Sequence, residues 1–163
     1  MRMHEAWGER LGDAMLRGQR SCLIGLQSLA GRLGGGRSLP KHLQTGLRGE
    51  FEALFYLRRR GYTIVARRWA SPKLRGDIDL VAWHGDRLCF IEVKTRTARD
   101  MTPAESAIDE EKRDTLRRLA RLYLHSFPES ERRSIATRFD VISVYCLDGA
   151  NEFDLFEGAF GWR

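Results

Sequence analysis

Two stretches of this chain set carboxylates and a lysine into strand-like sequence. They read Gly76-Asp77-Ile78-Asp79-Leu80 and Phe90-Ile91-Glu92-Val93-Lys94. Strand side chains alternate between faces, so Asp77 and Asp79 share one face of the first strand. For the same reason Glu92 and Lys94 share one face of the second strand. Carboxylates that hold a metal, with a lysine beside them, are groups with which proteins process phosphate esters.

The segment between these stretches contains Gly85-Asp86, which is typical of a hairpin turn. A hairpin centred there sets Asp79 opposite Glu92, and Asp77 opposite Lys94. Directly opposed side chains in an antiparallel pair have Cβ atoms roughly 4.5–5.5 Å apart. Two carboxylates at that distance repel each other unless a proton or a cation lies between them. We therefore expect a divalent metal at Asp79 and Glu92, with Lys94 beside it. The same register pairs Val81 with Phe90 and Trp83 with Leu88.

A simpler interpretation makes these charges surface ion pairs between strands, which are common and contribute roughly 0–1 kcal/mol. Asp79 argues against it, because the residue opposite Asp79 is an acid rather than a base. Asp77 stays open between two roles, an ion pair with Lys94 and a further contact to the metal.

The chain has 163 residues and a formal net charge of +6, from 28 Lys and Arg against 22 Asp and Glu. This length suits one domain, and the basic balance suits a nucleic-acid partner. The longest apolar stretch near the N-terminus, residues 22–33, is too short to span a bilayer. Cys22, Cys89 and Cys146 form no Cys-x-x-Cys pair, which argues against a zinc ribbon and predicts reduced thiols. We expect a cytoplasmic protein that does not bind membranes.

Residues 1–45 contain Gly34-Gly35-Gly36 and lack strand-like runs, which predicts a mobile N-terminal extension. The alternative is a short helix that contacts a membrane or a partner. Residues 46–163 are expected to form one domain with elements in the order αβββαβ. The patterns predict helices over 46–60 and 107–126, and strands over 62–69, 77–83, 88–94 and 139–147. Glu50 falls on the apolar stripe of the first helix and therefore needs a buried partner.

This order of elements, with spaced acids followed by Glu-x-Lys, resembles the PD-(D/E)xK nuclease superfamily. Residues 46–147 more narrowly resemble the YraN family, bacterial proteins of endonuclease-like character related to archaeal Holliday-junction resolvases. The matching segments are Gly46-x-x-Gly49-Glu50 with Ala53 and Leu57, Gly61-Tyr62, Gly76-Asp77-Ile78-Asp79-Leu80, Phe90-Ile91-Glu92-Val93-Lys94-Thr95-Arg96, Lys112, Ala120-x-x-Tyr123-Leu124 and Arg138-Phe139-Asp140-Val141. The family usually has Glu at the position of Asp77 and Asn at that of Arg68. The resemblance implies an α/β fold with a restriction-endonuclease-like core, in which helices flank a mixed central sheet.

The resemblance also implies a role for each residue of the site. Asp79 and Glu92 would hold Mg²⁺ or Mn²⁺, with the main-chain carbonyl of Val93 as a further ligand. Lys94 would orient the attacking water and steady the charge on the phosphate. Glu50 would reach the same site from the first helix, either binding a second metal or fixing Lys94. The implied activity is metal-dependent hydrolysis of DNA phosphodiester bonds, on branched or otherwise structured DNA.

Several basic residues lie outside this group. Arg96 is next to the site and is a candidate for contact with phosphate. Lys112 either contacts phosphate or lies along the apolar stripe of its helix with the ammonium in water. Arg113, Arg117 and Arg121 recur at helical spacing and either bind nucleic acid or form an ordinary solvated face. Asp140 is expected in a structural ion pair.

The competing function is a nucleic-acid-binding protein that keeps the fold but does not cleave. A pure binder gains nothing from carboxylates that face phosphates, which favours the enzyme. A third interpretation, an interaction module recruited through residues 1–45, leaves the acids unexplained. A homodimer is expected because four-way DNA junctions have two-fold symmetry.

Overall fold

The computed structural model describes residues 41–96, 108–147 and 150–162, with side chains from residue 45 onward. The chain divides into two units, Met1–Gln44 and Thr45–Arg163, and the second contains all the strands of the described residues. The extension predicted over residues 1–45 lies almost wholly outside the described residues, and so does Cys22. Cys89 and Cys146 are free thiols.

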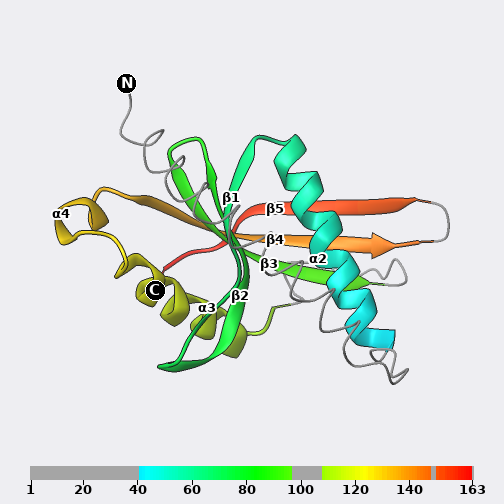
Figure 1. Ribbon diagram of the computed structural model, residues 1–163, viewed down its shortest axis with the longest axis horizontal. Helices are drawn as coiled ribbons and strands as arrows, with labels where there is room; N and C mark the ends of the chain where they lie inside the picture. Colours follow the sequence, from blue (N-terminus) through cyan, green and yellow to red (C-terminus); the bar gives the residue numbers. More distant parts are fainter. Residues whose placement is uncertain (1–40, 97–107, 148–149, 163) are drawn as a thin grey trace, which may run out of the picture. The chain divides into compact units, whose positions relative to one another are not determined.

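The described residues form three helices and five strands (Figure 1). In chain order these are α2 (Lys41–Arg59), β1 (Tyr62–Ser71), β2 (Leu74–His84), β3 (Arg87–Arg96), α3 (Glu110–Leu124), α4 (Glu129–Arg132), β4 (Ala136–Cys146) and β5 (Asn151–Phe160). The predicted order αβββαβ is present, and α4 and β5 extend it. The prediction missed β5 because its alternation of apolar and polar residues breaks at a bulge, near Gly158 with its φ of 66°.

The five strands form one sheet in the order β1-β2-β3-β4-β5. Every neighbouring pair is antiparallel except β3 and β4, which run parallel. Parallel neighbours need a crossover connection, and α3 lies in the segment that links them. The fold is therefore α/β with a mixed central sheet flanked by helices, consistent with a restriction-endonuclease-like core as predicted.

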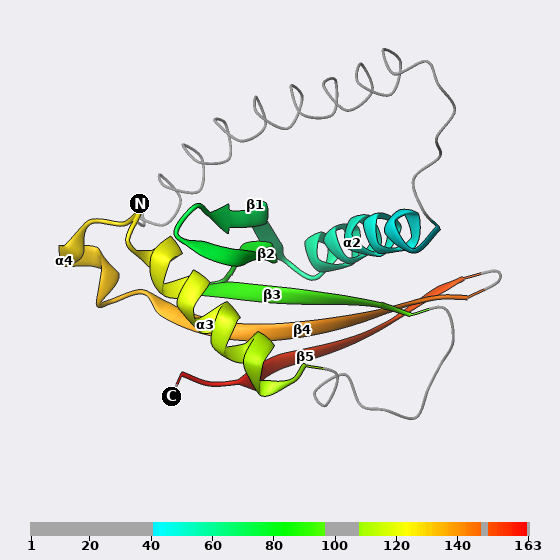
Figure 2. The same cartoon turned by 90° about the horizontal axis from the view of Figure 1, so that it is seen from below.

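The two long helices contact side chains that alternate along β3. Leu57 of α2 is fully buried in a cluster that includes Ile91. Phe90, the neighbour of Ile91, points to the other face and packs edge-on against Tyr123 of α3, with ring centroids 5.8 Å apart. Since adjacent strand residues face opposite ways, α2 and α3 pack on opposite faces of the sheet. Figure 2 shows the sheet nearly edge-on, with α2 above it.

The hairpin between β2 and β3 follows the predicted register. Val81 pairs with Phe90, and Trp83 with Leu88. Gly85 takes a φ of 62°, as the first central residue of a two-residue hairpin loop often does. The backbone pairing of β2 with β3 runs as far as Leu80 and Ile91. The acids lie immediately beyond that pair, where the chemistry of the site begins.

Within the described residues no helix is both long enough and apolar enough to cross a membrane.

Candidate active site

Asp79 and Glu92 are brought together at the end of the hairpin ladder. The Asp79 Oδ2 atom accepts a hydrogen bond of 2.7 Å from the main-chain N–H of Val93. A side chain thus replaces the backbone pairing that the register predicted at this point. The bond turns the Asp79 carboxylate toward β3, next to the residue that precedes Val93. The predicted juxtaposition of the two acids is present, although it depends on this side-chain contact.

Glu92 is the buried centre of the cluster, with a side chain 5% exposed. Lys94 Nζ lies 3.0 Å from Glu92 Oε1, and Lys112 Nζ lies 3.0 Å from Glu92 Oε2. The first lysine comes from the same strand, and the second reaches across from α3. Two ammonium groups therefore neutralise one carboxylate, an arrangement far from that of a surface ion pair.

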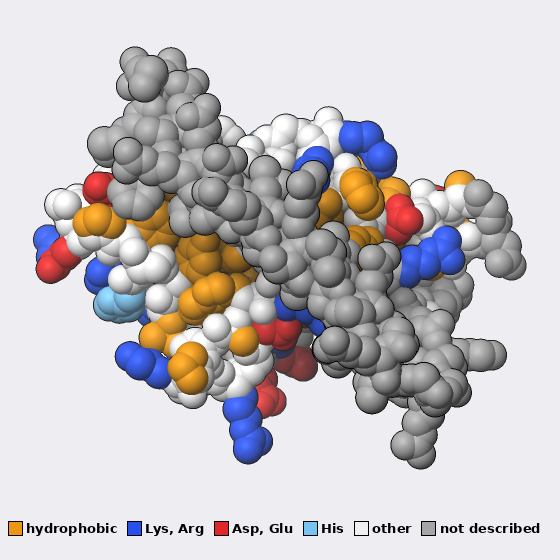
Figure 3. Space-filling view, in the orientation of Figure 1, with side chains coloured by type: hydrophobic (Ala, Val, Ile, Leu, Met, Phe, Trp, Pro, Cys, Tyr) orange, Lys and Arg blue, Asp and Glu red, His pale blue; other side chains and the backbone are white. Residues whose placement is uncertain are grey.

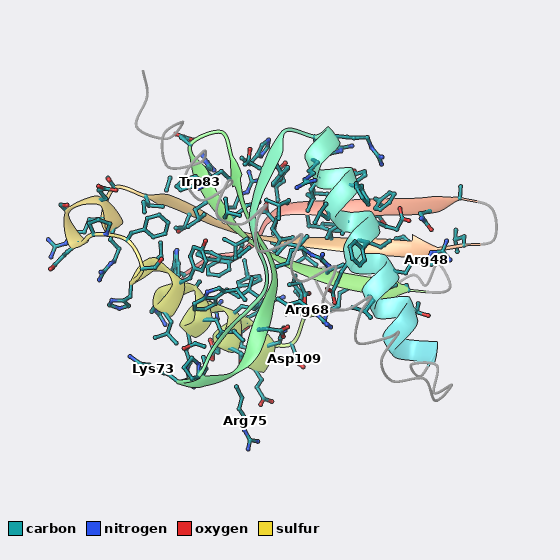
Figure 4. The ribbon with its side chains drawn as sticks, viewed as in Figure 1. Arg48, Arg68, Lys73, Arg75, Trp83 and Asp109 are labelled. Atoms are coloured by element: carbon teal, nitrogen blue, oxygen red, sulfur yellow. The ribbon has the colours of Figure 1, made fainter. Side chains whose placement is uncertain are left out.

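The N-terminal cap of α3 holds the backbone of Lys112. Asp109, labelled in Figure 4, is the N-cap residue, and its Oδ1 accepts from the main-chain N–H of Lys112 at 2.8 Å. This bond anchors the first turn of α3, from which the Lys112 side chain reaches Glu92 on β3. Of the two roles that the sequence left open for Lys112, the ammonium extended into water is wrong, because Lys112 contacts an acid of the site.

The predicted pair of Asp77 with Lys94 is wrong. Lys94 bonds Glu92, two residues away on the same face of its own strand. In the backbone ladder, Asp77 lies opposite Ala70 of β1, the strand on the other side of β2 from β3. The hairpin ladder has ended by this point, so the strands no longer hold these two residues opposite each other. Asp77 still acts on the site electrostatically, since its charge affects both Glu50 and Lys112.

Glu50 joins the site from α2, as the sequence predicted for an acid on an apolar stripe. It is 7% exposed, and its Oε2 lies 3.2 Å from Arg68 Nε. Gly49 permits this approach, because a Cβ at that position would collide with the side chain of Thr95. Helix α2 can therefore pass close to the end of β3, which brings Glu50 within electrostatic range of Asp79 and Glu92.

Arg68 was not predicted as a site residue. Among the described residues it is the one non-glycine residue with a positive φ, at 45°. That left-handed conformation costs an L-residue of order 1–2 kcal/mol, with Asn and Asp better suited to it than Arg. Asn is also the residue that the resemblance led us to expect here. No pattern in a single sequence signals this conformation in the middle of a strand.

Burial dominates the electrostatics of the acids. It raises the pKa of Asp79 to about 7, helped by the neighbouring charge of Glu92 and opposed by the Val93 hydrogen bond and by Lys112. Burial likewise raises the pKa of Glu50, against the influence of Arg68. Burial alone would lower the pKa of Lys112, but the charge of Glu92 close by raises it. Perturbed acids gathered with cations in this way are typical of a functional site.

The donor set fits a hard divalent cation in kind. Carboxylate oxygens are the ligands that Mg²⁺ and Mn²⁺ prefer. Glu50 Oε2 and Glu92 Oε2 are buried atoms without a hydrogen bond of good geometry, although each has a cationic nitrogen within ion-pair distance. Within the described part of the chain, no three Asp, Glu, His or Cys side chains are already arranged to hold one ion. Instead, the positive charges of Arg68, Lys94 and Lys112 lie against the carboxylates of Glu50 and Glu92. The main-chain carbonyl of Val93 stays a predicted ligand.

The arginine ridge of α3 packs against the C-terminal segment. The Arg117 side chain is 7% exposed, its Nη1 lies 2.7 Å from both Glu110 and Asp114, and its Nε donates to the carbonyl of Gly161 at 2.9 Å. Nε and Nη1 of Arg117 are thus engaged within the fold, and its contact with nucleic acid stays a prediction. Arg113 and Arg121 lie over the rings of Phe160 and Trp162, and Arg121 is exposed, as the solvated-face alternative expects. The contact of Arg96 with phosphate stays a prediction.

A second polar cluster lies on the α2 face, since Asp140 pairs with Ile91 in the ladder and points the same way. Arg138 bonds Asp140 twice, at 2.7 and 3.0 Å, and also bonds Glu157 and Tyr62. The prediction of Asp140 in a structural ion pair is confirmed. Burial and then Asp140 raise the pKa of Tyr62 and that of Cys89, which excludes both as ionised nucleophiles at neutral pH.

The positive charge does not single out this site by itself. In the space-filling view of Figure 3, the described Lys and Arg side chains lie at separate places on the visible face, with Asp and Glu between some of them. Net charge of +6 therefore describes the chain as a whole. Local geometry defines the site.

Comparison with known proteins shows that these residues lie in a segment shared with a protein family. Residues 49–144 match the model of a family described as "Uncharacterised protein family UPF0102". A UPF0102 protein of Koribacter versatilis is 48% identical over 121 residues, which cover 74% of this chain and 82% of the relative. One from Solibacter usitatus is 46% identical over 112 residues, covering 69% and 82%. One from Nitratidesulfovibrio vulgaris is 39% identical over 100 residues, covering 61% and 71%. The matched segment contains every acid and lysine of the cluster.

Proposed function

The chain belongs to the UPF0102 or YraN family, whose fold is nuclease-like, and from that premise we propose that it is a metal-dependent nuclease that hydrolyses DNA phosphodiester bonds. The observation that carries the proposal is the environment of Glu92, a buried carboxylate between two lysines and beside Asp79. A cluster of acids beside a phosphate site repels the phosphate unless a cation lies between them, which favours a metal-dependent enzyme over a simple binder.

The acids would hold the metal. Asp79 and Glu92 are the proposed ligands, with Glu50, Asp77 and the carbonyl of Val93 as further candidates. Bound Mg²⁺ or Mn²⁺ would supply a Lewis acid for the scissile phosphate and a water of lowered pKa. The pKa of Asp79, raised to about 7, means that this ligand is half ionised only near neutral pH.

The lysines would act on the phosphate and on the nucleophile. Lys94 Nζ is fixed by Glu92 at the edge of the acid cluster, where it would orient a water and donate to an oxygen of the phosphate. Lys112 would supply a second positive charge from the α3 side and compensate the charge that develops in the transition state. Glu50 would complete the site from α2 and balance these cations.

Structured DNA is the proposed substrate, and this rests on the family resemblance. A four-way junction presents two equivalent strands, so a homodimer with two sites would suit it. Light scattering of the purified protein with and without junction DNA tests that stoichiometry. The cytoplasm is the proposed compartment.

A second candidate is a non-catalytic DNA-binding protein, and one observation favours it. The lysines already neutralise Glu92, and no three described metal-binding side chains stand ready around one ion. In that case Glu92 would serve to hold Lys94 and Lys112 toward a phosphate. Binding would then weaken steeply with salt and would not depend on a divalent cation.

One experiment separates the two candidates. Purified protein is incubated with linear, nicked and four-way DNA in Mg²⁺, Mn²⁺ or EDTA, alongside Glu92→Gln and Lys94→Met. The control is Glu129→Gln, an exposed acid on α4. The nuclease predicts cleavage with metal that falls at least about 10²-fold in both site variants and not in the control. Intact DNA in every condition, together with tight metal-independent binding, would overturn it in favour of the binder.

A further inference from the structure

Arg68 lies on edge strand β1, next to the acid cluster. Its neighbours Arg67 and Trp69 pair with Leu80 and Ile78, so Arg68 falls opposite Asp79 across the ladder. The strand continues through this position although Arg68 takes a φ of 45°, a conformation for which an arginine is poorly suited. A strained residue that persists beside a cluster of functional groups is an observation that points to a role for its side chain.

The Arg68 side chain uses a small part of its hydrogen-bonding capacity. Its Nε lies 3.2 Å from Glu50 Oε2, and the side chain is 52% exposed. Among the described residues, Glu50 is its polar partner. A guanidinium carries five N–H donors in a planar fork, so an ion pair through Nε leaves the four Nη donors available on a half-exposed side chain. Figure 4 labels Arg68 where the ribbons of α2 and α3 approach the strands.

The neighbouring arginine is occupied elsewhere, which sets Arg68 apart. The guanidinium of Arg67 lies over the ring of Phe51 in α2, 4.2 Å from the ring centroid. Alternation along β1 would normally send Arg68 to the opposite face, away from α2. The left-handed backbone at Arg68 instead lets its side chain reach Glu50 in the same helix. The strain therefore has a geometric result, which is a fixed guanidinium at the rim of the acid cluster.

We propose that Arg68 is a phosphate-binding residue of this site, held by Glu50 and presenting its free guanidinium edge to a phosphate of a nucleic-acid backbone. The proposal rests on the proposed function for its choice of ligand. An exposed fork beside buried acids suits a phosphodiester adjacent to the one at the acid cluster, since the fork matches two oxygens of one phosphate. Free phosphate and mononucleotides offer the same chemistry, and the experiment separates these sources.

The test measures binding of a short fluorescent DNA duplex to the full chain by anisotropy, in EDTA, over a series of salt concentrations. The variants are Arg68→Gln, which removes the charge, and Arg68→Lys, which keeps the charge without the fork. The control is Arg133→Gln, an arginine next to α4 with a side chain 87% exposed that carries the same change in charge. Competition arms add inorganic phosphate or a mononucleotide to the wild-type complex.

We expect Arg68→Gln to weaken binding about tenfold near 0.1 M salt and to reduce the slope of log K against log salt by about 0.9, as loss of one phosphate contact does. Arg68→Lys should keep the slope and lose part of the affinity. Arg133→Gln should change neither. Inorganic phosphate and mononucleotide should compete weakly. Unchanged slope and affinity in Arg68→Gln would overturn the proposal, as would displacement of the duplex by either small phosphate at a concentration near that of the protein.

A second comparison separates recognition from support of the fold. Arg68→Gly relieves the backbone strain and Arg68→Ala does not, so the glycine variant should melt at the higher temperature. Both should lose DNA affinity equally if the side chain binds phosphate. Affinity that follows melting temperature instead would assign Arg68 a structural role. If the wild type cleaves DNA and Arg68→Gln binds DNA as the wild type does, only the proposed role of Arg68 is overturned. If Arg68→Gln weakens DNA binding as expected but the wild type cleaves no DNA, only the proposed nuclease activity is overturned.

Discussion

The carboxylate of Asp79 accepts the main-chain N–H of Val93 across 2.7 Å, at the point where the backbone pairing of β2 with β3 ends. This bond ties a buried acid of one strand to the residue that follows Glu92 on the other. The bond lowers the pKa of Asp79 and so offsets part of the rise that burial causes. The orientation of the Asp79 carboxylate is therefore set within the hairpin, whereas Glu92 is held by Lys94 and by Lys112 of α3.

The metal-free protein should become less stable as pH rises through neutrality. The folded pKa of Asp79 is about 7 against an ordinary value of 3.8, so the folded state holds a proton that the unfolded state releases. Its contribution is fully present below about pH 4 and is lost as pH rises through about 7. Asp79→Asn mimics the protonated acid and should gain stability relative to wild type between pH 5 and pH 8. Thermal melts in EDTA across that range measure the gain, and a difference that does not vary with pH would contradict the prediction.

Divalent cations should stabilise the protein through the acid cluster. At a concentration 100-fold above Kd, a cation that binds only the folded state adds about 2.7 kcal/mol, which raises Tm by roughly 5–10 °C for a chain of this size. Differential scanning fluorimetry with Mg²⁺ or Mn²⁺ measures the shift. Glu92→Gln and Asp79→Asn should abolish it, while Glu129→Gln keeps it. An equal shift in all four proteins would mean that the cations bind elsewhere.

Gly49→Ala should damage the site by pushing α2 away from β3. The added Cβ meets the side chain of Thr95, and overpacking of this kind costs about 1–3 kcal/mol. The displacement also moves Glu50, so cleavage or DNA binding should fall with stability. Gly46→Ala in the same helix is the matched control, because no atom lies within 4 Å of its Cβ. That variant should gain about 1 kcal/mol from helix propensity. Urea denaturation of both variants gives the comparison, and equal stability would show that the close approach at Thr95 is easily relaxed.

Asp140→Asn should unfold the protein more readily without altering the chemistry of the site. Asp140 is fully buried and accepts from Arg138 and from the Gly158 N–H at 2.9 Å, so the change removes the buried one of the two acids that pair with Arg138, the other being Glu157. We expect a loss of about 3 kcal/mol.

The same denaturation measurement on Glu129→Gln should show a change within about 0.5 kcal/mol, since that acid is 80% exposed. Affinity for DNA per folded molecule should be unchanged in Asp140→Asn. A specific loss of DNA binding at full stability would instead place the second cluster in the functional surface.

Much of the fold follows from local sequence. The Gly85-Asp86 turn fixes the register of β2 and β3, and residue alternation then sets which side chains share a face. The apolar stripe of α2 predicted that Glu50 would be buried with a partner, and it is. These predictions succeed because turn chemistry and side-chain periodicity act over a few residues. Strand β5 escaped prediction because its bulge interrupts that periodicity.

The partners of each charge were decided by tertiary structure. Lys94 binds Glu92 rather than Asp77, because the pairing of β2 with β3 ends before it could set Lys94 opposite Asp77. Arg117 is buried because the C-terminal segment, far away in the chain, folds over α3. Arg68 reaches Glu50 through a backbone conformation that no local pattern announces. The sequence by itself determined which acids and bases face a common region. Only the three-dimensional packing decided which of them touch, since an ion pair depends on distances of a few ångströms between residues brought together by the whole fold.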